Sequence, residues 1–251
     1  MPEIIDLNGA WQKVSGVAIA IAIDGTHTGI CYKSKNGHRL LHLAFHRWLK
    51  NDTNLNDYVI VVPDYEIEDS DNLVAITEAV WEANQSGTIL YGFGSPTEAF
   101  NDGGANDYLF GGRSFGLTCA SFVLAVFHKA MLPLVDYETW PSARTGDVEW
   151  QKQIIAKLKE YIVGRGYDDN SHVTRVENSV PAVRFRPVEV AASGLENIPT
   201  DFANIHSLIE NLCKSSNLKI RVLGGIRFFA YTPVSHCKGK LLDTLLRSGS
   251  P

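Results

Sequence analysis

Two β-type segments, "HTGICYKS" from His27 and "HRLLHLAF" from His38, flank the tripeptide Lys35-Asn36-Gly37. Asparagine and glycine both tolerate positive φ, and an Asn-Gly pair between apolar runs is the strongest short-range signal of a β-hairpin. We therefore expect two antiparallel strands with the turn centred on Asn36-Gly37. This hairpin constrains the fold strongly, because it fixes how two neighbouring strands pair.

The sequence around the hairpin predicts further strands and a helix. "VAIAIAI" (residues 17–23) is apolar throughout, as expected for a strand covered on both faces, and "YVIVVPDYEI" gives another strand that ends at Pro63. "NLVAITEAVWEAN" from Asn72 has apolar residues at helical spacing, with an N-cap at residues 70–71. "TILYGF" predicts a short strand, and residues 94–112, rich in Gly, Asn and Asp, predict a loop.

The C-terminal part predicts a second group of elements. "DVEWQKQIIAKLKEYIV" and "DFANIHSLIENLCK" have helical patterns, whereas "AVRFRPVEVAA" and "KIRVLGGIRFFAYTP" are β-type. We expect the internal domain boundary around residues 141–145. We expect an α+β protein with a core at residues 1–140 and a C-terminal α/β extension at residues 141–251 that packs on this core.

Composition excludes several functional classes. The 251 residues are 45% hydrophobic, which supports a sizeable core and argues against disorder. The net charge of −5 comes from scattered residues, with no Lys/Arg run of the kind that nucleic-acid binding needs. No apolar run reaches the length of a membrane span. We expect that the chain binds no nucleic acid and has no membrane span.

The four cysteines are irregularly spaced, which argues against a disulfide-stapled secreted fold: Cys31, Cys119, Cys213 and Cys237. Acidic residues precede the first apolar stretch, so the N-terminus does not resemble a conventional signal peptide. We therefore expect the protein in the cytoplasm, or exported without such a peptide. Cys213 and the pair His236-Cys237 also lack the Cys-x₂₋₄-Cys spacing of structural zinc sites, and no glycine-rich phosphate loop is present. We expect no metal and no cofactor.

Cys119 lies in "SFGLTCASFVLAVF", at the start of an apolar helix. Gly116 permits a sharp entry and Thr118 can act as the N-cap, so Cys119 falls in the first turn, where the helix dipole stabilises a thiolate. A buried cysteine that acts as a small hydrophobe is the alternative. A nucleophile also needs a general base, for which histidine is the usual residue.

His27 is the first candidate for this base because it opens a strand. His42, between leucines, needs a polar partner or a cleft and could orient the base. Strand alternation about the Asn36-Gly37 turn puts His27, His42 and His46 on one face, with His46 directly opposite His27. Either His42 or His46 is therefore a candidate third residue. A Cys119–His27 pair predicts a lowered thiol pKa and a raised histidine pKa, as in a thiolate–imidazolium pair.

In this order, the motifs "HTGI", "LLHL", "ILYGF" and "GLTCASFV" resemble the circularly permuted papain-like proteins of the NlpC/P60 superfamily, including the lecithin:retinol acyltransferase-like group. Histidine precedes cysteine in these proteins, whereas cysteine comes first in ordinary members. The resemblance implies an antiparallel sheet packed on the cysteine-bearing helix. It also implies that Cys119 is the nucleophile, His27 the base, His42 the orienting residue and Tyr91 a tyrosine that precedes the cysteine loop.

The sequence thus predicts a cysteine hydrolase or acyltransferase that cleaves a peptide, another amide or a lipid ester through an acyl-thioester on Cys119. Backbone N–H groups at the helix start, together with the Tyr91 hydroxyl, would stabilise the oxyanion. Two alternatives stay open. One is an ordinary-order peptidase in which His172, interpreted as opening a strand, is the base for Cys119. The other is a catalytically silent binding module that keeps the papain-like core.

Overall fold

The computed structural model describes residues 2–5, 14–101, 107–111, 115–142, 144–196 and 198–216. All of them belong to one compact unit, Met1–Ile220, and the second unit, Arg221–Pro251, lies outside the described residues. The β-type segment "KIRVLGGIRFFAYTP" and the pair His236-Cys237 therefore also lie outside them. The described part is an α+β structure with a six-stranded antiparallel sheet and six α-helices.

The strands form the sheet in the order β1-β6-β2-β3-β4-β5. Their bounds are β1 (Glu3–Ile5), β2 (Val17–Ala22), β3 (Thr28–Ser34), β4 (Gly37–Phe45), β5 (Trp48–Asp52) and β6 (Tyr58–Val62). The expected strands at residues 17–23 and before Pro63 are thus confirmed as β2 and β6. The residues of β2 from Val17 to Ile21 are buried, and Ile19 and Ile21 are fully buried.

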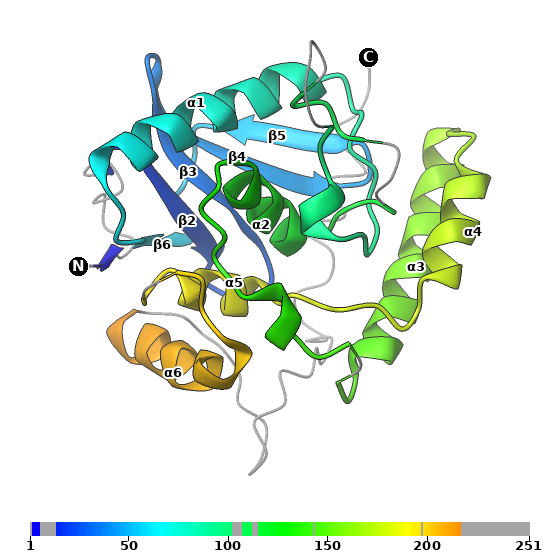
Figure 1. The fold of residues 1–251 in the computed structure, drawn as a ribbon. Coiled ribbons are helices and arrows are strands. Elements are labelled where there is room, and N and C mark those ends of the chain that lie inside the picture. Colours follow the sequence, from blue (N-terminus) through cyan, green and yellow to red (C-terminus); the bar gives the residue numbers. More distant parts are fainter. Residues whose placement is uncertain are drawn as a thin grey trace. The chain divides into compact units, whose positions relative to one another are not determined.

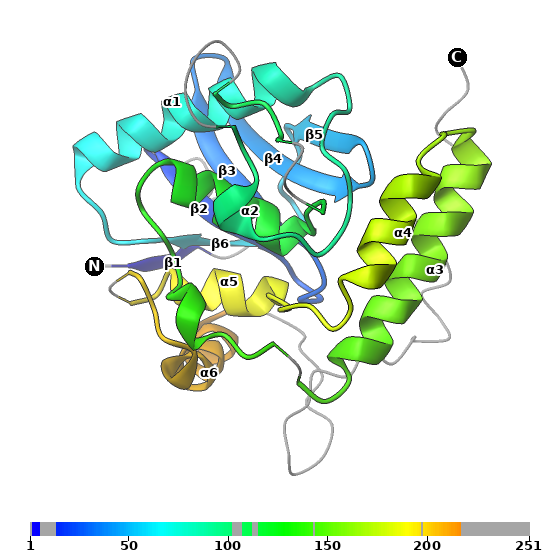
Figure 2. The ribbon, with the colours of Figure 1, turned by 45° about the vertical axis from the view of Figure 1, so that its right-hand side comes forward.

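The helices are α1 (Ile67–Asn84), α2 (Cys119–Lys129), α3 (Asp147–Arg165), α4 (Asn170–Asn178), α5 (Pro187–Ser193) and α6 (Ile205–Ser215). Helix α2 packs on β3 and β4, α1 on β2, β3 and β5, and α5 on β2 and β3. Figures 1 and 2 show α1, α2 and α5 on the same side of the sheet. The cysteine-bearing helix therefore lies directly on the two strands of the expected hairpin.

The hairpin is confirmed, but its register differs from the expected one. Ser34 pairs with Gly37, so Lys35-Asn36 forms the two-residue turn, and Gly37 enters β4 with φ +99. Ile30 then pairs with Leu41, which sets His42 opposite Gly29. A Cβ at Gly29 would lie only 2.7 Å from the His42 Cβ. The prediction that His46 lies opposite His27 is wrong, because the turn is centred one residue earlier.

Two further predictions of strands are wrong. "TILYGF" forms only an isolated bridge, in which Tyr91 pairs with Leu117. "AVRFRPVEVAA" begins irregularly and continues as α5, because Pro187 occupies the first turn and the Glu189 carboxylate accepts the Arg186 N–H. The helix expected from Asn72 is confirmed as α1 but begins earlier, at Ile67. The described residues after 144 are mainly helical, with no β-strand among them.

None of the helices in the described part of the chain combines the length and the apolar character that a membrane span requires.

Candidate active site

Cys119 is the first residue of α2, as the sequence predicts. The Ser121 N–H donates to Thr118 Oγ1 at 3.1 Å, and the Thr118 N–H donates to Ser121 Oγ at 2.8 Å, which completes a capping box. Gly116 adopts φ +89, and a Cβ there would lie 2.6 Å from the Tyr91 carbonyl carbon. The sharp entry and the cap thus hold Cys119 in a fixed position at the N-terminus of α2.

Cys119 is buried, with 8% of the residue exposed. Burial raises its pKa to about 11, although the backbone N–H groups of Thr28, Ala120 and Cys119 approach closely enough to act in the opposite direction. Thr28 directly follows His27 at the start of β3. The fold therefore brings the thiol against the backbone beside the predicted base.

A chain of hydrogen bonds connects His27 to a carboxylate. His27 Nε2 and His42 Nδ1 are 2.7 Å apart, and His42 Nε2 lies 3.1 Å from Asp52 Oδ2. The hydrogen bond from His42, assisted by Lys50 at 2.9 Å, lowers the pKa of Asp52 to about 2 despite its partial burial. The structure thus brings together the predicted base, the predicted orienting residue and a carboxylate. We name this set the His27 chain.

The carboxylate determines where the hydrogens of the neutral His27 chain lie. An ionised carboxylate only accepts hydrogen bonds, so His42 Nε2 must donate to Asp52. In a neutral ring His42 Nδ1 is then an acceptor, and His27 Nε2 must donate to it. His27 Nδ1 consequently carries a lone pair. This is the ring nitrogen that can accept a proton.

Burial also controls the ionisation of His27. It lowers the pKa of His27 to about 3, and the nearby His42 and Lys50 act in the same direction. The expected thiolate–imidazolium pair is therefore wrong for the resting site, because both shifts have the opposite sign. At neutral pH the site holds a neutral thiol and a neutral imidazole. If Cys119 acts as a nucleophile, a proton must therefore move from sulfur to nitrogen during the reaction.

His46 lies in a different cluster. Its Nε2 lies 2.8 Å from Asp169 Oδ2, and its Nδ1 accepts the Tyr91 N–H at 3.2 Å. Arg47 forms two hydrogen bonds to the same carboxylate, at 2.7 and 2.9 Å. His172 Nε2 donates to the Tyr91 carbonyl at 2.9 Å. We name these residues, His46, Arg47, Asp169 and His172, the His46 cluster.

Tyr91 lies between the two sets. Its backbone is held by His46 and His172, and its buried ring packs against Phe45 in a tilted arrangement with centroids 4.6 Å apart. Burial raises the pKa of Tyr91, and the charge of an ionised Cys119 would raise it further. The electrostatic effect indicates that the tyrosine and the thiol are neighbours. The oxyanion role of the Tyr91 hydroxyl stays a prediction.

The strand expected to begin at His172 is wrong, since this residue lies in helix α4. Its Nδ1 is buried and has no hydrogen-bond partner in the described part of the chain, and its Nε2 is committed to the Tyr91 backbone. His46, the other candidate for the third residue, is committed to Asp169. The hydrogen bonds therefore bring His27 together with His42, but with neither His46 nor His172.

Sequence reasoning missed Asp52. It ends β5, where His42 pairs with Lys50 and Leu40 with Asp52. The pattern "HRWLKND" could have indicated Asp52. A second short turn after β4 brings the following strand back beside His42, so the polar residues of that strand lie near this histidine. Among the described residues, no three His, Cys, Asp or Glu side chains are grouped as a metal ion would require.

No protein-family model, no curated protein and no solved structure matches this chain significantly.

Proposed function

We propose that the protein is a cysteine-dependent hydrolase or acyltransferase that cleaves an amide or ester through an acyl-thioester on Cys119. The observation that supports this proposal most strongly is the His27 chain, which leaves a lone pair on His27, the residue before Thr28, whose backbone N–H contacts the thiol. Nucleophile, base and orienting groups are the parts that acyl transfer by cysteine requires. His42 and Asp52 are positioning residues in this mechanism.

The first step forms the acyl-thioester. The Cys119 sulfur attacks the carbonyl carbon while His27 Nδ1 accepts the thiol proton. The tetrahedral intermediate then collapses, the bond to the leaving nitrogen or oxygen breaks, and this atom receives the proton from His27. In the second step water or another acceptor attacks the thioester, gives its proton to His27, and releases the thiol. The proton on His27 is transient, so a low resting pKa of the imidazole favours its return.

Negative charge that develops on the carbonyl oxygen would be stabilised at the start of α2. The N–H groups of Cys119 and Ala120 already approach the sulfur, and the helix dipole adds to their effect. In the capping box the Thr118 side chain accepts the Ser121 N–H. It therefore forms no hydrogen bond there with the N–H groups of Cys119 and Ala120. These donors support an oxyanion hole at this position.

The proposal includes the fold class suggested by the residue order. The base precedes the nucleophile in the sequence, and the cysteine-bearing helix packs on the strands that carry the histidines. This arrangement supports a permuted papain-like core of the NlpC/P60 type. It disfavours the ordinary order, in which His172 would have to reach Cys119 while donating to the Tyr91 carbonyl.

The burial of the thiol favours one competing function, a binding module without turnover. A pKa of about 11 leaves little thiolate at neutral pH. The two functions are distinguished by whether Cys119 accepts an acyl group. We expect p-nitrophenyl acetate to release p-nitrophenolate and to leave an acetyl group on Cys119, detected by mass spectrometry of the peptide.

Cys119→Ala should abolish both signals, whereas Cys213→Ala, which removes a half-buried thiol on α6, should retain them. Acetylation spread equally over other nucleophiles, or release unchanged in Cys119→Ala, would contradict the proposal and support a binding module.

A further inference from the structure

We propose that a subsite beside Cys119, formed by Arg184 and a small aromatic pocket, binds a carboxylate of the substrate. The preferred substrate is then an amide or ester whose acyl part or leaving group carries a carboxylate. This inference rests on the proposed function of Cys119, but the binding of the carboxylate can be tested separately from turnover.

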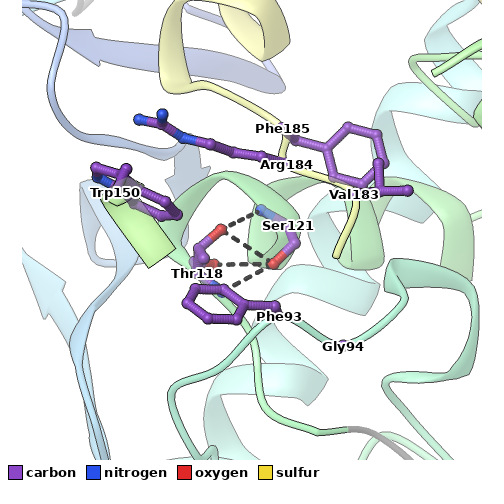
Figure 3. A pocket seen from close by; sticks show the side chains of 8 residues that line it. All are labelled: Phe93, Gly94, Thr118, Ser121, Trp150, Val183, Arg184 and Phe185. Carbon is purple, nitrogen blue, oxygen red and sulfur yellow. Dashed lines mark hydrogen bonds between the residues drawn. The ribbon is translucent and has the colours of Figure 1, made fainter. Parts of the chain in front are cut away.

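The pocket borders the N-terminus of α2. Thr118 and Ser121, the capping residues on either side of Cys119, line it together with Arg184 and the rings of Phe93, Trp150 and Phe185. Its volume is about 10 Å³, which is room for roughly one water molecule. Figure 3 shows Arg184 extending from the segment of Phe185 toward Trp150, with the capping residues between this segment and Phe93. A pocket of this size suits a single small polar group.

Arg184 belongs to a buried group of charges. Arg144, Arg184 and Arg186 contact the carboxylates of Asp147 and Glu189, and all five side chains are at most 15% exposed. Arg144 binds both carboxylates, at 2.9 Å for Asp147 and 2.5 Å for Glu189. Among the described residues, Arg184 forms its ion pair with Asp147 Oδ1, which it shares with Arg186.

The two arginines differ in how well their charge is compensated. Burial opposes the charge of Arg144, yet Glu189 and Asp147 raise its pKa above the ordinary value. Burial lowers the pKa of Arg184 to about 10, and Asp147 does not offset this effect. Arg184 Nε is buried and has no hydrogen-bond partner among the described residues. Stacking on Trp150 at 3.8 Å supports the cation but leaves this donor unused.

An additional anion would complete this arrangement, because a buried charge without sufficient partners is costly. Arginine binds carboxylates through two parallel hydrogen bonds, and the unused Nε is one of the donors of such a pair. The positive charge of Arg184 also lowers the pKa of Cys119, as a secondary effect after burial. The charge of Arg184 therefore acts on the thiol, and the pocket that it lines borders the residue before Cys119.

The test compares two reagents that differ in charge. Iodoacetate carries a carboxylate and iodoacetamide is its neutral counterpart, and both alkylate the same sulfur. The ratio of the two alkylation rates at Cys119 does not depend on thiol ionisation, because both reagents react with the same thiolate. Dividing it by the same ratio for glutathione removes the difference in intrinsic reactivity between the two reagents. We expect this corrected ratio to be roughly tenfold above one in the wild type, as a single arginine–carboxylate contact allows. Arg184→Gln should reduce it to about one, whereas Arg175→Gln, on the exposed side of α4, should not.

Asp147→Asn provides a second variant with the opposite expected sign. It removes the carboxylate that competes for Arg184, so the corrected ratio should rise, whereas damage to the fold would not favour iodoacetate. A corrected ratio near one in the wild type, or the same ratio in all variants, would overturn the carboxylate subsite. A high ratio that Arg184→Gln abolishes would support the subsite even if Cys119 proved unable to accept an acetyl group.

Discussion

The His27 chain and the His46 cluster are built from the same residue types, but their hydrogen bonds end differently. The His27 chain runs from Asp52 through His42 and leaves one nitrogen of His27 outside the chain. In the His46 cluster both nitrogens of His46 are used, by Asp169 and by the Tyr91 N–H. One set can therefore accept a proton from a neighbour, whereas the other fixes the backbone.

The difference shows that a carboxylate beside a histidine is not by itself a sign of catalysis. Asp169 is held by Arg47 as well as by His46, and together they hold the segment before α4 against the loop that follows β4. Asp52 is shared with Lys50 but is 35% exposed, at the open end of β5. The position of the thiol distinguishes the two sets.

The largest expected effect distinguishes His27 from His172 as the general base. His27→Ala should lower the rate of acetyl transfer from p-nitrophenyl acetate to Cys119 by roughly a hundred- to ten-thousand-fold, because the thiol loses its proton acceptor. His172→Ala should change this rate by less than about threefold, provided that the variant is folded. Rates are measured from p-nitrophenolate release and from the acetylated Cys119 peptide. The reverse pattern would assign the base to His172.

A smaller effect concerns stability and should appear only in the His46 cluster. Asp169→Ala leaves the Arg47 and His46 side chains without their carboxylate, and because Arg47 and Asp169 are only partly buried we expect a loss of about 2 kcal/mol of unfolding free energy. Denaturant unfolding measures this difference. Glu177→Ala breaks the exposed pair with Lys159 and should cost less than about 1 kcal/mol. Equal losses in both variants would show that the His46 cluster has no special structural role.

Asp52→Asn should have a moderate effect on acetyl transfer and little effect on stability. The amide keeps the shape of the side chain but can donate as well as accept, so it no longer fixes the tautomers of His42 and His27. We expect a rate roughly tenfold lower. The decrease should change with pH, which a purely structural role would not cause. Asp57→Asn, an exposed neighbour, is the matched control. If the acetyl-transfer rate of Asp52→Asn varied with pH as in the wild type, Asp52 would not belong to the His27 chain.

The smallest effect is the pH dependence of stability. His27 has a lower pKa in the folded protein, about 3, than its ordinary value of 6.5. Between these values the unfolded chain binds a proton that the folded protein does not, so unfolding becomes easier as pH falls. The contribution approaches about 1.4 kcal/mol per pH unit. His27→Ala should therefore lose less stability than the wild type between pH 6.5 and 5. A steeper loss in the variant would contradict the burial of a neutral His27.

Local signals in the sequence predicted the parts of the site that depend on neighbouring residues. Gly116, Thr118 and Cys119 lie within four positions of one another, so the entry and the cap of α2 could be identified from them alone. The hairpin followed from Asn36 and Gly37 in the same way. These features depend on backbone preferences that act over a few residues.

The remaining features depend on register or on tertiary contacts, which local patterns do not determine. A turn centred one residue earlier moved His42, instead of His46, beside His27. Asp52 joins the site only through the pairing of β4 with β5. The pKa values of Cys119 and His27 depend on burial by distant segments, so the directions of their pKa shifts were predicted wrongly.

The most direct test of the His27 chain is the protonation of the two nitrogens of His27 at neutral pH. ¹⁵N NMR of the protein with labelled histidine distinguishes a ring nitrogen that carries a hydrogen from one that does not, and the spectrum of His27→Gln assigns the signals. We expect the hydrogen on Nε2 and a lone pair on Nδ1, with the His27 ring neutral. A hydrogen on Nδ1 of His27 would leave the thiol without a proton acceptor and would contradict the proposed mechanism.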